Sequence, residues 1–174
     1  VGSPPGPVIR SARRPTRRLA SGDAGLYVAV AGVLASVAIP AFLKYQRRAK
    51  TVEVTQNLRR LFDGAVAHAQ STGRFPATAP LTPAQPACDG GRSVARAPGA
   101  QAWAHATWRA LGFRPRGPLY YQYEFISDGQ RFTARALGDL NCDGVRSTFE
   151  RVGELGVDGT VSGGAGLYEK NALE

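Results

Sequence analysis

The longest apolar run in the chain extends from Ala24 to Leu43 and contains no charged residue. Its 20 residues would form a helix about 30 Å long at about 1.5 Å per residue, which matches the hydrocarbon thickness of a bilayer. A cleaved signal peptide is the alternative interpretation, because a basic stretch precedes the run. The length of the run and the helical pattern that follows it favour a retained transmembrane helix.

After Leu43 the pattern becomes that of an amphipathic helix, which we expect to end at about Gln70, before Gly73. Its apolar positions recur at spacings of three and four residues. They are Val54, Leu58, Leu61, Phe62, Ala65, Val66 and Ala69. Pro40 lies inside the apolar run and is expected to kink the helix, because proline lacks a backbone donor. The sequence therefore predicts one helical rod over residues 24–70.

The C-terminal part of the chain changes period. Residues 71–100 are rich in proline and glycine, so we expect no regular structure there. A short helical segment follows at 101–111. Alternating apolar and polar residues at 119–126 and 131–137, on either side of an Asp-Gly turn, predict a β-hairpin. A second strand pair is expected around Asp158-Gly159. The predicted fold class is α+β, a long N-terminal helix packed on a small antiparallel sheet.

The net charge of +9 is concentrated near the N-terminus. Residues 1–60 contain eleven basic and two acidic side chains, whereas the rest of the chain is neutral. Basic residues that flank an apolar span interact with lipid headgroups, and the stretch lacks the interleaved aromatics typical of nucleic-acid binding. We therefore divide the chain into a disordered basic tail (1–23), a transmembrane helix (24–43), its amphipathic continuation (44–70) and a globular domain (71–174).

One stretch of the apolar run resembles a known signature. Residues 32–42 read GVLASVAIPAF, which is similar to the GILAAIAIPAF signature of type IV pilins and includes its proline. The segments YYQYEF, GDLNCDGVRSTFERVG and GGAGLYEKN also resemble pilin-like proteins of delta-proteobacterial type. The resemblance implies a structural subunit without enzymatic activity, in which the helix and especially Asp23, Gly32 and Pro40 serve membrane insertion and assembly.

The same resemblance implies a location and partners. The chain would be anchored in a bacterial inner membrane with its C-terminal domain exported, and could enter a pilus or pseudopilus made with other pilin-like subunits. It implies no nucleic-acid partner for the globular domain and no small-molecule substrate. The family spacing places the glycine of the cleavage site at Arg18 and the following glutamate at Asp23. A second hypothesis is therefore an uncleaved, membrane-anchored monomer that binds a partner without forming filaments.

Residues 139–150 match the calcium-loop pattern D-x-[DN]-x-[DN]-G-x5-E. Alternate oxygen-bearing residues could surround a cation, and Gly144 permits the sharp bend that such a loop requires. The predicted calcium ligands are Asp139, Asn141, Asp143, the Val145 carbonyl, Ser147 and Glu150. The alternative interpretation is an acidic turn stabilised by its own side chains.

Cys88 and Cys142 are the only two cysteines. Export to an oxidising compartment would favour a disulfide between them, and two free thiols are the alternative. The two histidines, His68 and His105, are interpreted as a helix-surface residue and a loop residue. No spacing in the sequence indicates a catalytic motif, so we expect no enzymatic activity.

Overall fold

The computed structural model describes residue 2, residues 21–163 and residues 166–174. Most of the basic tail predicted for 1–23 lies outside these residues, and the side chain of Asp23 is also not described. The chain forms two compact units, which divide between Ala41 and Phe42.

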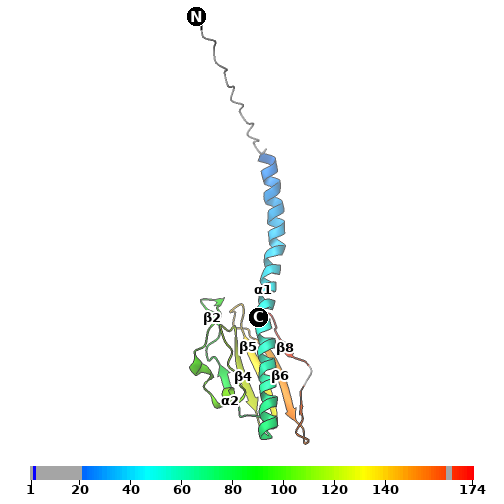
Figure 1. The fold of residues 1–174 in the computed structure, drawn as a ribbon. Helices are drawn as coiled ribbons and strands as arrows, with labels where there is room; N and C mark the ends of the chain where they lie inside the picture. Colours follow the sequence, from blue (N-terminus) through cyan, green and yellow to red (C-terminus); the bar gives the residue numbers. More distant parts are fainter. Residues whose placement is uncertain (1, 3–20, 164–165) are drawn as a thin grey trace. The chain divides into compact units, whose positions relative to one another are not determined.

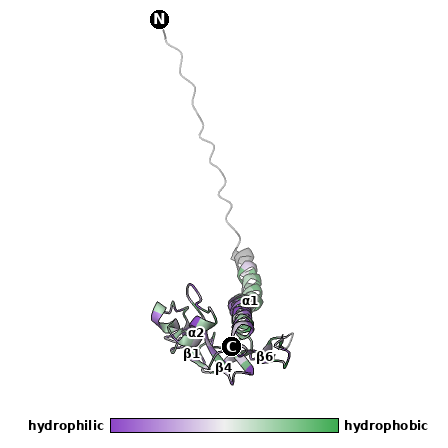
Figure 2. Cartoon of the chain, turned by 60° about the horizontal axis from the view of Figure 1, so that its bottom comes forward, coloured by the Kyte–Doolittle hydropathy of each residue, from purple (hydrophilic) through white to green (hydrophobic). Residues whose placement is uncertain are grey.

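The long N-terminal helix is confirmed. α1 extends over Ser21–Thr72 and includes Pro40. It ends where Gly73 adopts a positive φ of 74°, and the Gly73 amide donates to the Ala69 carbonyl at 2.8 Å. A glycine tolerates this left-handed conformation and so terminates a helix. Figure 2 shows hydrophobic residues along the first part of α1.

The second unit, Phe42–Glu174, contains an antiparallel sheet with strand order β1-β4-β5-β6-β7, and β8 pairs with β6. The strands of this sheet are β1 (Ala79–Thr82), β4 (Tyr121–Ser127), β5 (Arg131–Gly138), β6 (Ser147–Leu155), β7 (Val161–Ser162) and β8 (Tyr168–Lys170). A separate small hairpin joins β2 (Cys88–Asp89) to β3 (Arg92–Ser93). The short helices are η1 (Ala100–Trp103) and α2 (Ala106–Ala110). Within this unit α1 runs across one face of the sheet (Figure 1).

The hairpin predicted around Asp128-Gly129 is present as β4 and β5, and the strand pair around Asp158-Gly159 is present as β6 and β7. The expectation of no regular structure over 71–100 is wrong, because β1, β2 and β3 lie there. Pro80 lies inside β1, which occupies an edge of the sheet. A proline is tolerated in an edge strand, where one side of the backbone needs no ladder partner.

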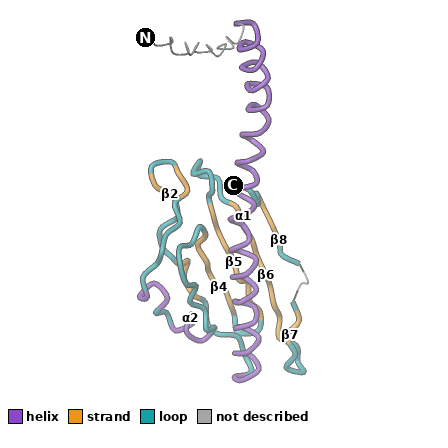
Figure 3. Tube along the Cα trace, turned by 45° about the horizontal axis from the view of Figure 1, so that its top comes forward, coloured by secondary structure: helices purple, strands orange, loops and turns teal. Residues whose placement is uncertain are grey.

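The core of the second unit lies between α1 and the sheet (Figure 3). The predicted helical stripe supplies Val54, Leu58, Leu61, Ala65 and Ala69, all of which are buried. Phe132 of β5 lies among three other rings, with centroid distances of 5.6 Å to Phe62, 4.7 Å to Phe75 and 5.0 Å to Phe125. The alternation read from the sequence therefore identifies the buried face of the hairpin correctly.

One glycine permits a close approach of two backbones. A Cβ atom added to Gly64 of α1 would lie only 2.2 Å from the carbonyl oxygen of Leu111, which follows α2. The neighbouring segment therefore packs directly onto the helix backbone at this position. Trp103, Trp108 and Phe113 of the same segment are buried, with ring centroids 5.3–5.6 Å apart.

Candidate functional site

The first candidate site is the apolar surface of α1 in the first unit. The large apolar side chains from Leu26 to Ile39 are at least half exposed, and Leu26, Val33 and Leu34 are 64–68% exposed. Among the described residues, nothing beyond the helix's own backbone and the two chain neighbours lies within 4 Å of a Cβ atom added to Gly32. By length and composition, this part of the helix is apolar enough to span a membrane. Its side chains supply a surface that lipid tails or other apolar helices could cover.

The second candidate site is the loop 139–146 between β5 and β6, which carries the predicted calcium ligands. Its side-chain oxygens bind backbone amides of the loop itself. The two Asp139 carboxylate oxygens accept from the Cys142 amide at 2.6 Å and the Gly144 amide at 3.0 Å. The Asp143 carboxylate accepts from the Val145 amide at 2.7 Å and from the side-chain amide of Asn141 at 2.9 Å. These bonds hold a closed turn, as Asx side chains commonly do.

The remaining predicted ligands lie in strand β6. The Ser147 hydroxyl is buried and donates to the Gly138 carbonyl at 3.1 Å. The Glu150 carboxylate accepts from the Arg135 guanidinium at 2.5 Å, and the same guanidinium donates to Glu124 at 2.6 Å. Arg135 and Glu150 are directly paired across β5 and β6. In this arrangement Glu150 forms a cross-strand ion pair through one of its oxygens, so a bidentate contact with a cation would compete with Arg135.

Among the residues that the structure describes, one group of three metal-ligating side chains comes together, namely Cys88, Asp139 and Cys142. The two cysteines form a disulfide, which removes the thiolates that a metal would need. The predicted calcium carboxylates do not form such a group in this conformation. Calcium binding by the loop therefore stays a prediction.

The predicted disulfide between Cys88 and Cys142 is confirmed, with Cα atoms 5.8 Å apart. It joins the β2–β3 hairpin to the loop 139–146 through two cysteines that are 54 positions apart in sequence. Cys142 adopts a positive φ of 59°, a conformation that L-residues seldom take. The amide of Cys142 is held there by the Asp139 carboxylate, so the loop's hydrogen bonds and the disulfide support the same turn.

A third polar cluster was not predicted from the sequence. Glu53 of α1 is turned toward the sheet, and its carboxylate accepts from the Tyr120 amide at 2.9 Å and from the Tyr123 hydroxyl at 2.8 Å. Asn57 donates its side-chain amide to the same hydroxyl at 2.9 Å. Burial raises the pKa of Glu53, although the hydrogen bonds from Tyr120, Tyr123 and Tyr121 act in the opposite direction. This network fixes the helix to β4 through polar groups within the packed interface.

The chain was compared with protein-family models, with curated proteins and with solved structures, and none of the three comparisons finds a match.

The sequence signal that could have found Glu53 is its position. It lies one residue before Val54, at the edge of the apolar stripe, where a polar side chain reaches the boundary of the core. By contrast, no sequence pattern indicates that Arg135 pairs with Glu150, because that contact depends on the register of two strands joined by an eight-residue loop.

Proposed function

We propose that this chain is a type IV pilin-like structural subunit, anchored by residues 24–43 in a bacterial inner membrane, with residues 44–174 exported. The observation that carries the proposal is the contrast along α1. Its first part exposes large apolar side chains, whereas a regular stripe of its second part is buried against a sheet. A helix that is apolar around its circumference requires a nonaqueous or protein environment.

Several further features support the proposal. The second unit combines α1 with an antiparallel sheet, and the disulfide suits an oxidising compartment. The segment 32–42 resembles the pilin signature, and small residues such as Gly32 allow apolar helices to approach closely. In this function, the exposed surface of α1 would pack against the same surface of other subunits in a filament.

Topology is tested first. Reporter fusions after Gly22 and after Glu174 should place the first in the cytoplasm and the second outside it. A cytoplasmic reporter at the C-terminus would exclude the exported domain.

Assembly is tested by oxidative cross-linking in native membranes. Val33→Cys introduces a thiol on the apolar surface, where the native side chain is 68% exposed. We expect covalent dimers from Val33→Cys and few from Val157→Cys, a fully exposed control in the second unit. Equal yields from both variants would indicate random collision and contradict assembly through the helix.

The second candidate function is an uncleaved, membrane-anchored monomer that binds a partner. It is favoured by Arg18, which occupies the position of the cleavage-site glycine in the pilin resemblance. The mass of the native N-terminus separates the two candidates. An uncleaved N-terminus together with no dimers from Val33→Cys would support the monomer over the filament subunit.

A further inference from the structure

A hollow of about 480 Å³ lies at the C-terminal end of α1, between this helix, α2 and the β4–β5 turn. Its walls are largely apolar and include Pro76, Ala77, Ala106 and Ala110. Two nitrogen-bearing side chains, His68 and Arg74, also line it. Concave, mostly apolar hollows with a few polar groups are the usual form of small-ligand sites.

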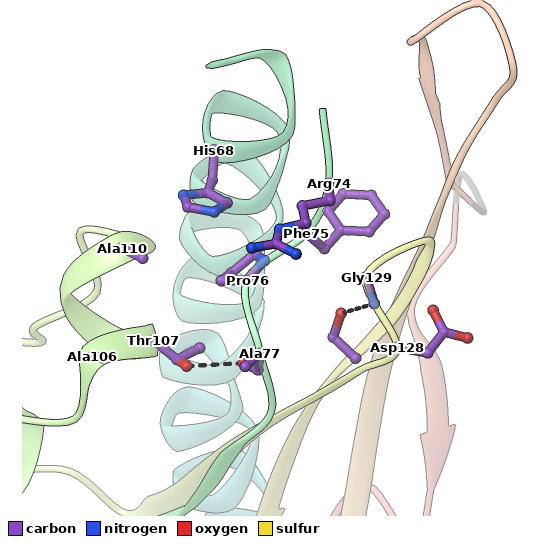
Figure 4. Close-up of a pocket in the computed structure, with 11 residues that line it drawn as sticks. His68, Arg74, Phe75, Pro76, Ala77, Ala106, Thr107, Ala110, Asp128 and Gly129 are labelled. Carbon is purple, nitrogen blue, oxygen red and sulfur yellow. Dashed lines mark hydrogen bonds between the residues drawn. The ribbon is translucent and has the colours of Figure 1, made fainter. Parts of the chain in front are cut away.

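The polar groups of the hollow are not equivalent. In Figure 4 the Arg74 guanidinium extends toward the imidazole of His68, whereas the Asp128 carboxylate points away from both. Within the described part of the chain, neither His68 nor Arg74 forms an ion pair. The Thr107 hydroxyl is already used, because it donates to the Ala77 carbonyl at 2.9 Å.

The charge of Asp128 is also engaged elsewhere. Its carboxylate accepts from the backbone amides of Gln130 at 2.9 Å and Arg131 at 2.7 Å. The acid therefore stabilises the β4–β5 turn rather than neutralising Arg74. What the hollow offers to a ligand is an N–H-rich end formed by His68 and Arg74 and an apolar wall beside it.

We propose that this hollow binds a monocarboxylate, with its acid group at His68 and Arg74 and its apolar body against Pro76 and Ala110. A guanidinium presents paired N–H groups that match the two oxygens of a carboxylate. One permanent cation suits one negative charge, and the apolar wall suits an organic body better than a fully hydrated phosphate. This site is independent of membrane anchoring and of assembly through α1.

A carboxylate could be supplied by a small free acid or by the C-terminus of an extended peptide. Acetate and an N-acetylated alanine tripeptide with a free C-terminal carboxylate represent the two sources. The corresponding tripeptide amide is the matched probe without the charge. Sodium phosphate tests whether the site selects a different anion.

The experiment uses the full chain in detergent micelles at constant ionic strength, with imidazole signals followed by NMR. His68 and His105 are the only histidines, so two signals report on the whole protein. The His105 Nδ1 accepts from the Thr107 amide at 3.3 Å, and His105 does not line the hollow, which makes its signal an internal reference. We expect a saturable shift of the His68 signal with a carboxylate probe and none with the amide. Saturation by acetate alone indicates a small acid, and tighter binding of the tripeptide indicates a peptide terminus.

Matched variants complete the test. Arg74→Gln removes an exposed cation and should weaken carboxylate binding about tenfold, as expected for the loss of a charge-assisted hydrogen bond. Arg109→Gln removes an exposed cation of α2 that does not line the hollow, and should leave the affinity unchanged. The proposal is overturned if no carboxylate saturates the His68 shift, if the amide binds as well, if phosphate alone binds, or if Arg74→Gln has no effect.

Discussion

The carboxylate of Glu53 and the hydroxyl of Tyr123 lie 2.8 Å apart, with Tyr123 donating the hydrogen bond. Tyr123 is completely buried in β4, and Glu53 belongs to α1, so the bond joins the helix to the sheet. Because the Tyr123 oxygen also accepts from Asn57, its single proton is directed to Glu53. The network defines how each of its members responds to substitution and to pH.

Glu53→Gln should change the pH dependence of stability. Burial raises the pKa of Glu53, so between the ordinary glutamate value of about 4.3 and the raised value the folded state binds more protons than the unfolded state. The stability due to this group is therefore full below the ordinary value and is lost as pH rises through the raised one. Thermal melts of the full chain in detergent should show the stability of wild type falling relative to that of Glu53→Gln as pH rises above about 4.3. A difference in melting temperature that is constant with pH would contradict this assignment.

Replacing both cysteines by serine should destabilise the second unit. The bridge joins Cys88 and Cys142, which are 54 positions apart in sequence. Loop entropy gives an expected loss of about 4 kcal/mol in the free energy of unfolding. Denaturant unfolding of oxidised wild type and of the Cys88→Ser/Cys142→Ser variant measures it. The presence of the bridge in wild type is verified by non-reducing peptide mapping. Equal unfolding midpoints for the two proteins would then show that the bridge does not contribute to stability.

Gly64→Ala should be destabilising although alanine is the better helix former. The substitution gains about 1 kcal/mol of helix propensity. Its Cβ, however, would lie 2.2 Å from the Leu111 carbonyl oxygen, and a backbone atom cannot move aside as a flexible side chain can. We expect the overpacking cost to exceed the gain, with a net loss of about 1 kcal/mol or more in unfolding free energy.

The matched control for Gly64→Ala is Gly32→Ala in the same helix, where an added Cβ meets no other segment of the described chain within 4 Å. It should leave the unfolding of the second unit unchanged. A stabilised Gly64→Ala variant would mean that the segment after α2 does not approach the helix as described.

Calcium should raise the melting temperature of the oxidised chain if the loop 139–146 binds it together with Glu150. A bound ion would offset the repulsion between Asp139, Asp143 and Glu150, and would stabilise the fold by about 2.7 kcal/mol at a hundredfold excess over its dissociation constant. Magnesium should substitute poorly, because it demands a smaller octahedral shell.

Glu150→Gln is the decisive variant for the calcium prediction. It would remove the predicted bidentate ligand but also weaken the ion pair with Arg135, so its effect must be measured with and without the ion. We expect the variant to lose most of the calcium-dependent increase. If calcium leaves the wild-type melting temperature unchanged, the loop is a hydrogen-bonded turn only.

Periodicity identified the parts of the fold that depend on local pattern. The burial of Val54, Leu58 and Leu61 follows from helical spacing, and the hairpin follows from the Asp-Gly turn between alternating strands. Strand β1 was not predicted, because its four residues around Pro80 carry no periodic signal. They pair with β4, which lies some forty residues later in the chain.

Contacts set by tertiary structure could not be read in the same way. Gln122 alternates with tyrosines and therefore looks solvent-facing, yet it is buried and donates to the Pro83 carbonyl at 2.7 Å. The calcium pattern places Glu150 at the right sequence position, but the register of β5 and β6 sets it opposite Arg135. The hollow at His68 and Arg74 forms from three distant segments, so His68 appeared to be only a surface residue.

The last residues of the chain return to the beginning of the second unit. The Arg47 guanidinium donates to the Leu173 carbonyl at 3.1 Å, and the side chain of Asn141 contacts the carboxylate of Glu174. A fluorophore or affinity tag fused to Glu174 would therefore emerge beside Arg47 and the β5–β6 loop. A force applied at Glu174 would first act on the contacts of Leu173 and Glu174 and would then separate β8 from β6. The disulfide would meanwhile keep the loop 139–146 attached to the β2–β3 hairpin.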